Sequence, residues 1–260
     1  KSGKANWNNN RYELSFLFQN TKDVLSFFAP GAYIADSTAL SMKITADGQM
    51  KANVKSGRIA LKDKYLKGIK LSADNASGKL GGVMTVGELS AGPIKTMANK
   101  LSFNADADSL SVDFSYDNKT ELENRGVIHL GGNIFRDEND TLRAKFRFFP
   151  SHILLNGAKW DISSSDISFG GSDINIGNLS IHGDNQSIVL SGGYSPTMAD
   201  TLRLKMDKFD ISMLNAFSKM DLKIKGLLSG NAVLISPTKE RTGLLLGMTC
   251  DSGEFGGERI

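Results

Sequence analysis

The sequence predicts an all-β protein, a mostly antiparallel multi-stranded sheet with two short helices. Three observations predict this class. Apolar and polar residues alternate along most of the chain, which is the period of a β-strand. Turn-forming residues separate the alternating runs at roughly 8–12-residue spacing. Glycine is abundant at 27 residues and proline scarce at 5, a balance that favours strands joined by Gly, Asn and Asp turns.

The alternating runs have one apolar side and one polar side. The clearest cover residues 14–18, 110–116, 142–148, 202–206 and 244–250. This is the pattern of antiparallel sheets with one face toward water. The turn signals between runs are Asp47-Gly48, Gly81-Gly82, Asp117-Asn118, Gly131-Gly132, Asp137 to Asp140, Gly170-Gly171, Gly183-Asp184 and Gly192-Gly193.

Two short segments depart from the alternation and predict helices. Residues 22–28 and 211–220 group their apolar side chains on one side, and Asp210 precedes the second as a candidate N-cap. Each helix lies between two alternating strands, so residues roughly 12–55 and 200–246 form a weak internal repeat. No linker or composition shift divides the chain, and we predict one continuous repetitive β domain over residues 1–260.

Composition excludes several classes of protein. The net charge is +3, and the 31 basic and 28 acidic residues are interspersed, so no nucleic-acid-binding patch is predicted. Cys250 is the single cysteine, which excludes an intrachain disulfide framework. No run approaches the roughly 18 apolar residues of a membrane span. No signal peptide opens the chain and both ends are abrupt, so we expect an internal segment of a longer protein.

The search for catalytic chemistry finds no motif. The three histidines lie outside metal-ligand spacings, and no pair of acids sits in a segment predicted to be buried. The segment that starts at Asn104 begins like a calcium loop but has Ser109 and Ser115 where Gly and a bidentate acid are needed, so we interpret it as a polar turn. We therefore predict a protein that is not an enzyme and has no cofactor and no metal.

The apolar side of the strands is the feature that needs a functional explanation. Two sheets can pack their apolar faces together as a β-sandwich with a dry core. Alternatively, a single sheet can curl so that its apolar face lines a groove, which then needs acyl chains, an apolar strand or a partner to cover it. Periodicity alone favours the sandwich.

A set of motifs between residues 156 and 225 resembles the TamB translocation and assembly module family, in particular its Bacteroidetes-type members. In that family a Trp strand, a short strand, a Gln-containing strand that ends in Gly and an Asp-x-Leu-x-Leu strand precede a Phe-Asp-Leu-Ser-x-Leu helix. The matching residues are Trp160-x-Ile162, Ile167-x-Phe169, Ile174-x-Ile176-x-x-Leu179-x-Ile181, Asn185-Gln186-Ser187-Ile188-x-Leu190-x-Gly192, Asp200-x-Leu202-x-Leu204 and Phe209-Asp210-Ile211-Ser212-x-Leu214. Residues 12–44 resemble the same module less closely.

The resemblance implies an elongated, curved, trough-like sheet with an apolar concave face, a shape called a β-taco. It also implies that the parent protein is AsmA-like and forms a bridge between membranes. It implies a periplasmic location in a Gram-negative bacterium, with the parent protein anchored in the inner membrane and joined to an outer-membrane partner of the Omp85 type by regions outside this chain. The expected ligands are phospholipid acyl chains or unfolded outer-membrane β-strands, in the service of outer-membrane biogenesis. The family has no catalytic residues to transfer.

Under this interpretation the candidate groove residues are the alternating apolar positions of the strands. They are Phe114, Phe146, Phe148, Ile174, Ile176, Leu179, Ile181, Ile188, Leu190, Leu202, Leu204 and Met206. The alternative remains a structural or adhesive β-sandwich or β-helix in which the same residues form a dry core.

Overall fold

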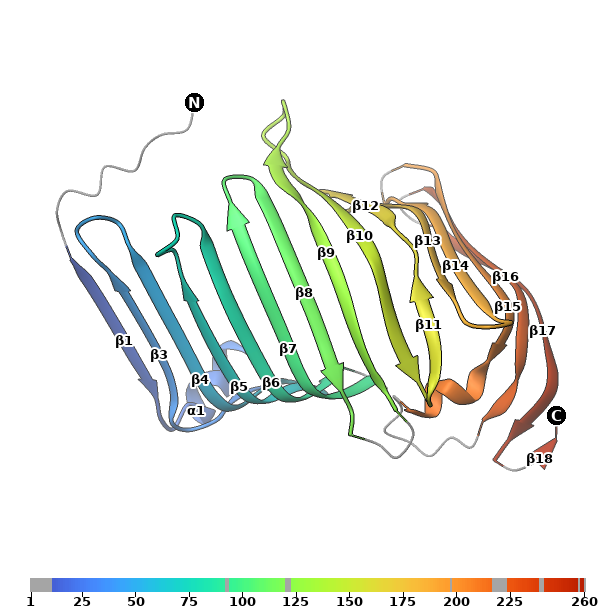
Figure 1. Ribbon diagram of the computed structural model, residues 1–260, viewed down its shortest axis with the longest axis horizontal. Coiled ribbons are helices and arrows are strands. Elements are labelled where there is room, and N and C mark those ends of the chain that lie inside the picture. The colour runs from blue at the N-terminus through green and yellow to red at the C-terminus, as the bar shows by residue number, and fades with distance from the viewer. Residues whose placement is uncertain are drawn as a thin grey trace. The chain divides into compact units, whose positions relative to one another are not determined.

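The computed structural model describes residues 11–91, 94–119, 123–196, 198–216, 224–238, 241–256 and 258–259. The chain divides into two compact units, unit 1 (Lys1–Asp106) and unit 2 (Ala107–Ile260). Both consist almost entirely of antiparallel strands, which confirms the predicted all-β class (Figure 1). The paired strands of each unit form one sheet and not two facing sheets. The prediction of a single continuous domain stays a prediction.

Unit 1 is a meander that includes one α-helix. β1 pairs with β3, β2 and β3 pair with β4, and β4 to β7 pair in sequence order, all antiparallel. The elements are β1 (Tyr12–Phe18), α1 (Lys22–Phe28), β2 (Ala32–Ile34), β3 (Thr38–Ile44), β4 (Met50–Leu61), β5 (Lys64–Asp74), β6 (Leu80–Ala91) and β7 (Ile94–Asp106).

Unit 2 continues the same pattern with one interruption. Its strands pair antiparallel in chain order, except that β11 and β12 share one position between β10 and β13. The elements are β8 (Ser109–Asp117), β9 (Arg125–Arg136), β10 (Leu142–Leu155), β11 (Ala158–Ile162), β12 (Ser165–Gly170), β13 (Asp173–His182), β14 (Ser187–Tyr194), β15 (Asp200–Asp210), the 3-10 helix η1 (Ile211–Ala216), β16 (Lys225–Thr238), β17 (Arg241–Phe255) and β18 (Glu258–Arg259).

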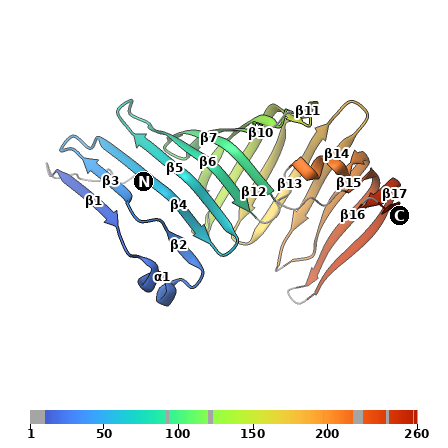
Figure 2. The same cartoon turned by 90° about the horizontal axis from the view of Figure 1, so that it is seen from below.

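The two predicted helices have different outcomes. Residues 22–28 form α1 with the predicted bounds, next to β2 at the margin of unit 1 (Figure 2). The second begins at Ile211 as predicted but is a 3-10 helix that ends at Ala216. Residues 217–220 lie outside the described residues. The Asp210 side chain accepts a hydrogen bond from the Ser212 backbone N–H (2.9 Å), which confirms its capping role.

Three of the predicted Gly-Gly turns are wrong, because these pairs lie inside strands. Gly81-Gly82 is in β6, Gly131-Gly132 in β9 and Gly192-Gly193 in β14. At two of these pairs the glycine lies under an aromatic ring of the next strand. A Cβ at Gly82 would lie 2.5 Å from the Phe103 ring, and a Cβ at Gly132 would lie 2.7 Å from the Phe146 ring. The glycines therefore make room for large side chains and do not turn the chain.

β-Bulges keep the apolar residues of unit 2 on one side. In β13 the register shifts between Ile176 and Leu179, and in β15 it shifts between Met206 and Phe209. These residues are three positions apart, so a regular strand would point them to opposite faces. The extra residue of each bulge cancels that change. The bulges therefore explain why the apolar face continues past the points where the alternation breaks.

Candidate functional site

The candidate site is the apolar face of unit 2, which the strand register assembles residue by residue. Residues directly opposite one another in a β-ladder point to the same side of the sheet. One row of opposed residues crosses unit 2 from β8 to β17. It runs Leu110, Gly132, Phe146, Ile167, Ile176, Gly192, Leu202, Leu234 and Leu244.

The neighbouring rows extend this face along the strands. Leu179, Leu190, Leu204, Ala232 and Leu246 form one row, and Ile181, Ile188, Met206, Gly230 and Met248 form the next. All twelve predicted groove residues lie in unit 2 on this side of the sheet. Most are half-buried, with Ile174 more open at 37% exposure and Ile176 more closed at 9%. The sequence thus predicted which residues share a face.

The apolar face of unit 2 is concave. Trp160 of β11 and Phe209 of β15 are three strand positions apart in the sheet, through β13 and β14. Strands lie about 4.8 Å apart, so a flat sheet would hold the backbones of these residues about 14 Å apart. Their ring centroids are 5.9 Å apart, in an edge-to-face arrangement. This contact favours a sheet that bends toward its apolar side at this end.

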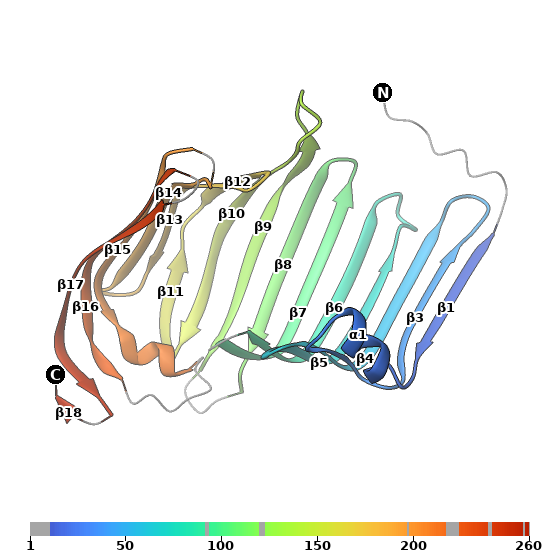
Figure 3. The same ribbon diagram turned by 180° about the vertical axis from the view of Figure 1, so that it is seen from behind.

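A buried cluster fills one end of this concave face. Its members are Leu155, Trp160, Phe209 and Met213, where Met213 comes from η1 and the others from β10, β11 and β15. Figure 3 shows η1 beside the end of β11. Three of the predicted groove residues, Ile181, Ile188 and Met206, pack against this cluster. At this end, Ile181, Ile188 and Met206 are part of a core and do not line an open groove. The alternation of apolar and polar residues is the same for both roles, so the sequence did not distinguish them.

Tyr116 of β8 lies on the same side of the sheet, opposite Gly126 of β9. It is buried to 7% exposure, and this burial raises the pKa of its phenol to about 12. The tyrosine therefore stays neutral at physiological pH. It adds an apolar ring to the face and no charge.

The opposite face of unit 2 carries solvated ion pairs. Arg147 and Asp166 lie directly opposite each other in β10 and β12 and form two hydrogen bonds of 2.5 and 2.8 Å. The Arg147 guanidinium lowers the pKa of the Asp166 carboxyl. Because both side chains are exposed, the ion pair is hydrated and contributes little to the stability of the fold.

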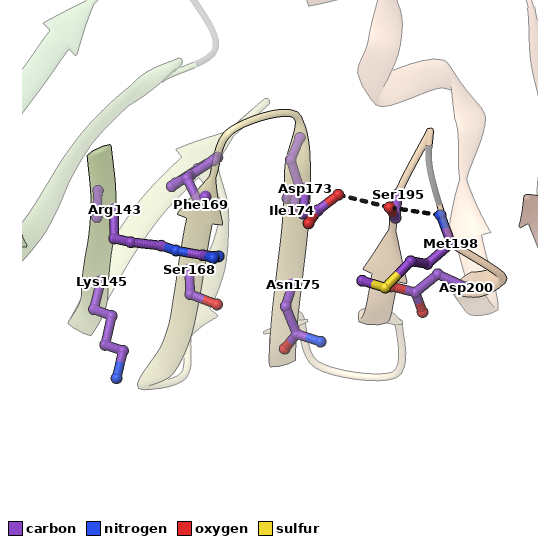
Figure 4. Close-up of a pocket in the computed structure, with 12 residues that line it drawn as sticks. Arg143, Lys145, Ser168, Phe169, Asp173, Ile174, Asn175, Ser195, Met198 and Asp200 are labelled. Atoms are coloured by element: carbon purple, nitrogen blue, oxygen red, sulfur yellow. Dashed lines mark hydrogen bonds between the residues drawn. The ribbon is translucent and has the colours of Figure 1, made fainter. Parts of the chain in front are cut away.

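A cavity of about 210 Å³ lies at the ends of β10, β12 and β13. Figure 4 shows Asp173 and Met198 on either side of Ser195. The Ser195 hydroxyl donates to Asp173 Oδ1 (2.6 Å) and accepts from the Met198 backbone N–H (3.1 Å). The Ser195 carbonyl in turn accepts from the Ser236 hydroxyl, and both serines are buried. These hydrogen bonds connect Ser195, just after β14, to β13 and β16.

The described residues contain no group of three or more His, Cys, Asp or Glu side chains able to hold a metal ion. His182 ends β13, is exposed, and contacts the Ser180 hydroxyl through Nε2 (2.7 Å). His129 contacts Asp113 on the exposed side (2.6 Å). Asp106, in the calcium-like segment, forms an exposed ion pair with Lys79 (3.0 Å). These polar side chains therefore have local partners within the sheet.

No protein-family model, no curated protein and no solved structure matches this chain. The resemblance to the TamB family therefore rests on the motifs of residues 156–225 and stays a prediction. Among the described helices, none has the length and apolar character to cross a membrane.

Proposed function

We propose that this chain is a non-enzymatic, periplasmic segment of a TamB/AsmA-like protein, and that its apolar concave face accommodates lipid acyl chains or nascent outer-membrane protein strands in outer-membrane biogenesis. One observation carries the proposal. The apolar face of unit 2 is concave, continues from strand to strand, and remains half-exposed in a sheet of a single layer. An apolar surface of this extent is costly in water unless something covers it.

The second candidate is a structural or adhesive β-protein with a dry core. The buried cluster around Trp160 supports it, because that end of the concave face is filled by the chain's own side chains. The two functions differ in what a charge on the face does. A charge in an open groove stays solvated and blocks an apolar ligand, whereas a charge in a closed core is buried without a partner and unfolds the chain.

The test introduces three arginines on the open part of the face, Ile174→Arg, Leu204→Arg and Leu246→Arg. None of these residues belongs to the buried cluster, and Leu246 is 65% exposed. We expect photo-crosslinking to a phospholipid with a diazirine in its acyl chain to fall at least tenfold. The melting temperature should stay within a few degrees, because the new guanidinium groups remain in water.

The matched control carries the same added charge on the other face, as Asn175→Arg, Asn231→Arg and Leu245→Arg, and we expect it to keep crosslinking within twofold of wild type. A folded groove variant that captures lipid as well as wild type would contradict the proposal. A groove variant that unfolds while the control folds would favour the dry core. An unfolded strand peptide that displaces the lipid would identify protein strands as ligands of the same face.

A further inference from the structure

A row of lysines crosses the polar face of unit 1, within its central strands. Residues directly opposite one another in a β-ladder share a face. From β4 to β7 the opposed residues of this row are Lys55, Lys70, Thr85 and Lys100. The row faces away from apolar residues such as Val54, because successive side chains of a strand alternate between the two faces. Lys55 and Lys70 are therefore two cations directly opposite each other on adjacent strands (Figure 1).

A second row of the same face also contains two lysines but balances their charges. Lys43 of β3 lies opposite Glu13 of β1, and Lys51 of β4 lies opposite Asp74 of β5. Opposite charges across a sheet are favourable, whereas like charges directly opposite are destabilising. The row that joins β4 to β7 has three lysines and no acidic residue, so its repulsion is not offset within the row.

No carboxylate of the described chain forms an ion pair with the three lysines of this row, Lys55, Lys70 and Lys100. All three are exposed. Asp74 is the acidic residue of β5 on this face, and it lies four residues from Lys70, which is about 13 Å along a strand. A charge at that distance is largely screened in physiological salt. The protein therefore leaves the positive charges of the lysine row without a close counter-charge.

The polar face has a cavity of about 460 Å³ beside the lysine pair, over β3, β4 and β5. Lys55 and Lys70 both line it. The other polar side chains of its lining are small, and four of them are opposed in one row, Ser15, Ser41, Asn53 and Ser72. None of these four side chains hydrogen-bonds to another described residue. The cavity thus combines two ammonium groups with hydroxyl and amide groups that can donate hydrogen bonds to a ligand.

We propose that this cavity, which we call the lysine cavity, binds a phosphate-bearing ligand, with one phosphate group between Lys55 and Lys70. An anion at this position replaces the repulsion of two cations by two attractions. A phosphate monoester carries about two negative charges and three strong acceptor oxygens, which match two ammonium groups and the neighbouring hydroxyls. Lysine binds phosphate as a point charge, so its flexible side chain needs no fixed geometry. The inference is independent of the function proposed for unit 2.

Lys100 extends the site along the same row. β6 lies between Lys70 and Lys100, and strands lie about 4.8 Å apart, so the backbones of the two residues are about 10 Å apart. Thr85 lies between them and adds a hydroxyl to the lining of the cavity. We therefore expect Lys100 to strengthen the binding of a ligand that carries a second phosphate group.

The first experiment titrates the full chain with inorganic pyrophosphate at low ionic strength and follows binding by phosphorus NMR. We expect saturable binding, weakened at least tenfold by Lys55→Gln with Lys70→Gln. Lys100→Gln should weaken it less. The matched control, Lys43→Gln with Lys51→Gln, removes the same charge from the same face and should bind within twofold of wild type. Equal losses in the two double variants would overturn the site, because the general charge of the face would then explain the binding.

The second experiment measures the melting temperature in phosphate and in chloride at equal ionic strength. Phosphate should raise the melting temperature of the wild-type chain, since a ligand that binds the native state stabilises it. Lys70→Glu places a carboxylate opposite Lys55. This variant should melt at a higher temperature than wild type in chloride and should lose the effect of phosphate. A Lys70→Glu chain that phosphate stabilises as much as wild type would contradict the proposal.

The third experiment identifies the source of the phosphate group by comparing pyrophosphate with vesicles of phosphatidic acid in phosphatidylcholine. Binding of the vesicles alone, lost in Lys55→Gln with Lys70→Gln, would assign the cavity to a lipid headgroup. Binding of pyrophosphate alone would assign it to a soluble phosphate. Both results support a phosphate site.

Two results would overturn the phosphate site. One is the absence of binding of both phosphate probes at millimolar concentration. The other is binding of heparin where neither phosphate probe binds, which would assign the lysines to an anionic polysaccharide. The groove triple variant in unit 2 should bind the phosphate probes within twofold of wild type. Failure of the lysine cavity is therefore distinguishable from failure of the proposed function.

Discussion

Gly132 and Phe146 show how single residues build the apolar face. Phe146 lies directly opposite Gly132, and a Cβ at Gly132 would lie 2.7 Å from the phenylalanine ring and 2.1 Å from the Lys145 carbonyl oxygen. The ring therefore covers the space that a side chain would occupy on β9. The same pairing recurs in unit 1, where Phe103 lies over Gly82. The Gly-Gly pairs resemble turns in the sequence, but inside these strands they make room for aromatic rings.

We predict that Gly132→Ala destabilises the protein by about 1–3 kcal/mol, because the added methyl group clashes with backbone and with the Phe146 ring. The matched control is Gly247→Ala in β17, where no atom lies within 4 Å of the new Cβ. We expect its free energy of unfolding to stay within about 0.5 kcal/mol of wild type. Urea denaturation followed by circular dichroism measures both. Equal effects of the two substitutions would show that the aromatic contact is unimportant.

At the scale of elements, the bulges determine which residues reach the concave face. β13 carries Ile174 and Ile176 before its bulge and Leu179 and Ile181 after it, all on one face. The bulge also leaves the Asn178 backbone N–H to hydrogen-bond with the Ser165 hydroxyl (3.1 Å). β13 therefore keeps a hydrogen bond to its neighbour at the change of register. Its apolar residues before and after the bulge point to the same concave face.

Two single-residue deletions in β13 should have different outcomes. Deletion of Asn178 removes the extra residue of the bulge, so Leu179 stays on the concave face. We expect a folded protein that loses about 1 kcal/mol with its hydrogen bond. Deletion of Asn175 makes Ile174 adjacent to Ile176, so one of these two isoleucines must point to the polar face. That error exposes one large side chain, at about 1.5–3 kcal/mol.

Thermal unfolding followed by circular dichroism compares the two deletions, which remove the same amino acid from the same strand. The Asn178 deletion should unfold cooperatively near the wild-type temperature, and the Asn175 deletion should lower the transition temperature more than the Asn178 deletion does. If the Asn178 deletion is the more damaging of the two, the bulge has a role other than keeping the register.

At the scale of the whole molecule, the exposed surface is large for the mass. The chain exposes 16895 Å², whereas a compact globular protein of 28.1 kDa exposes about 11,000 Å². Within each unit, a sheet of a single layer leaves both faces in contact with solvent, so apolar residues are half-buried by their neighbours on the same face. The apolar area removed from water on folding is correspondingly small.

The heat-capacity change of unfolding should therefore be low. Globular proteins show about 12–15 cal/mol/K per residue, or about 3–4 kcal/mol/K for a chain of this length. We expect a smaller value by differential scanning calorimetry, unchanged when the protein is diluted tenfold. A value within the globular range at all concentrations would mean that the apolar face is covered in solution.

The sequence predicted the elements of the fold well because the strand period is a local property. The alternating runs correspond to strands, the twelve groove candidates share one face, and α1 has its predicted bounds. The errors arose where a local signal has two physical meanings. Gly-Gly favours a turn in isolation but also makes room for a ring such as Phe146, and only the neighbouring strand decides between these.

By itself the sequence determined that this protein is a sheet with one apolar face, because successive side chains of a strand alternate between its two faces whatever the rest of the chain does. Only the tertiary structure decided that the face of unit 2 is concave and that Trp160 and Phe209 close one end of it. It also decided that Met213 of η1 is buried, whereas Phe27 and Phe28 of α1 are exposed to solvent. Curvature and burial depend on contacts between strands that are far apart in the chain, and no local pattern records those contacts.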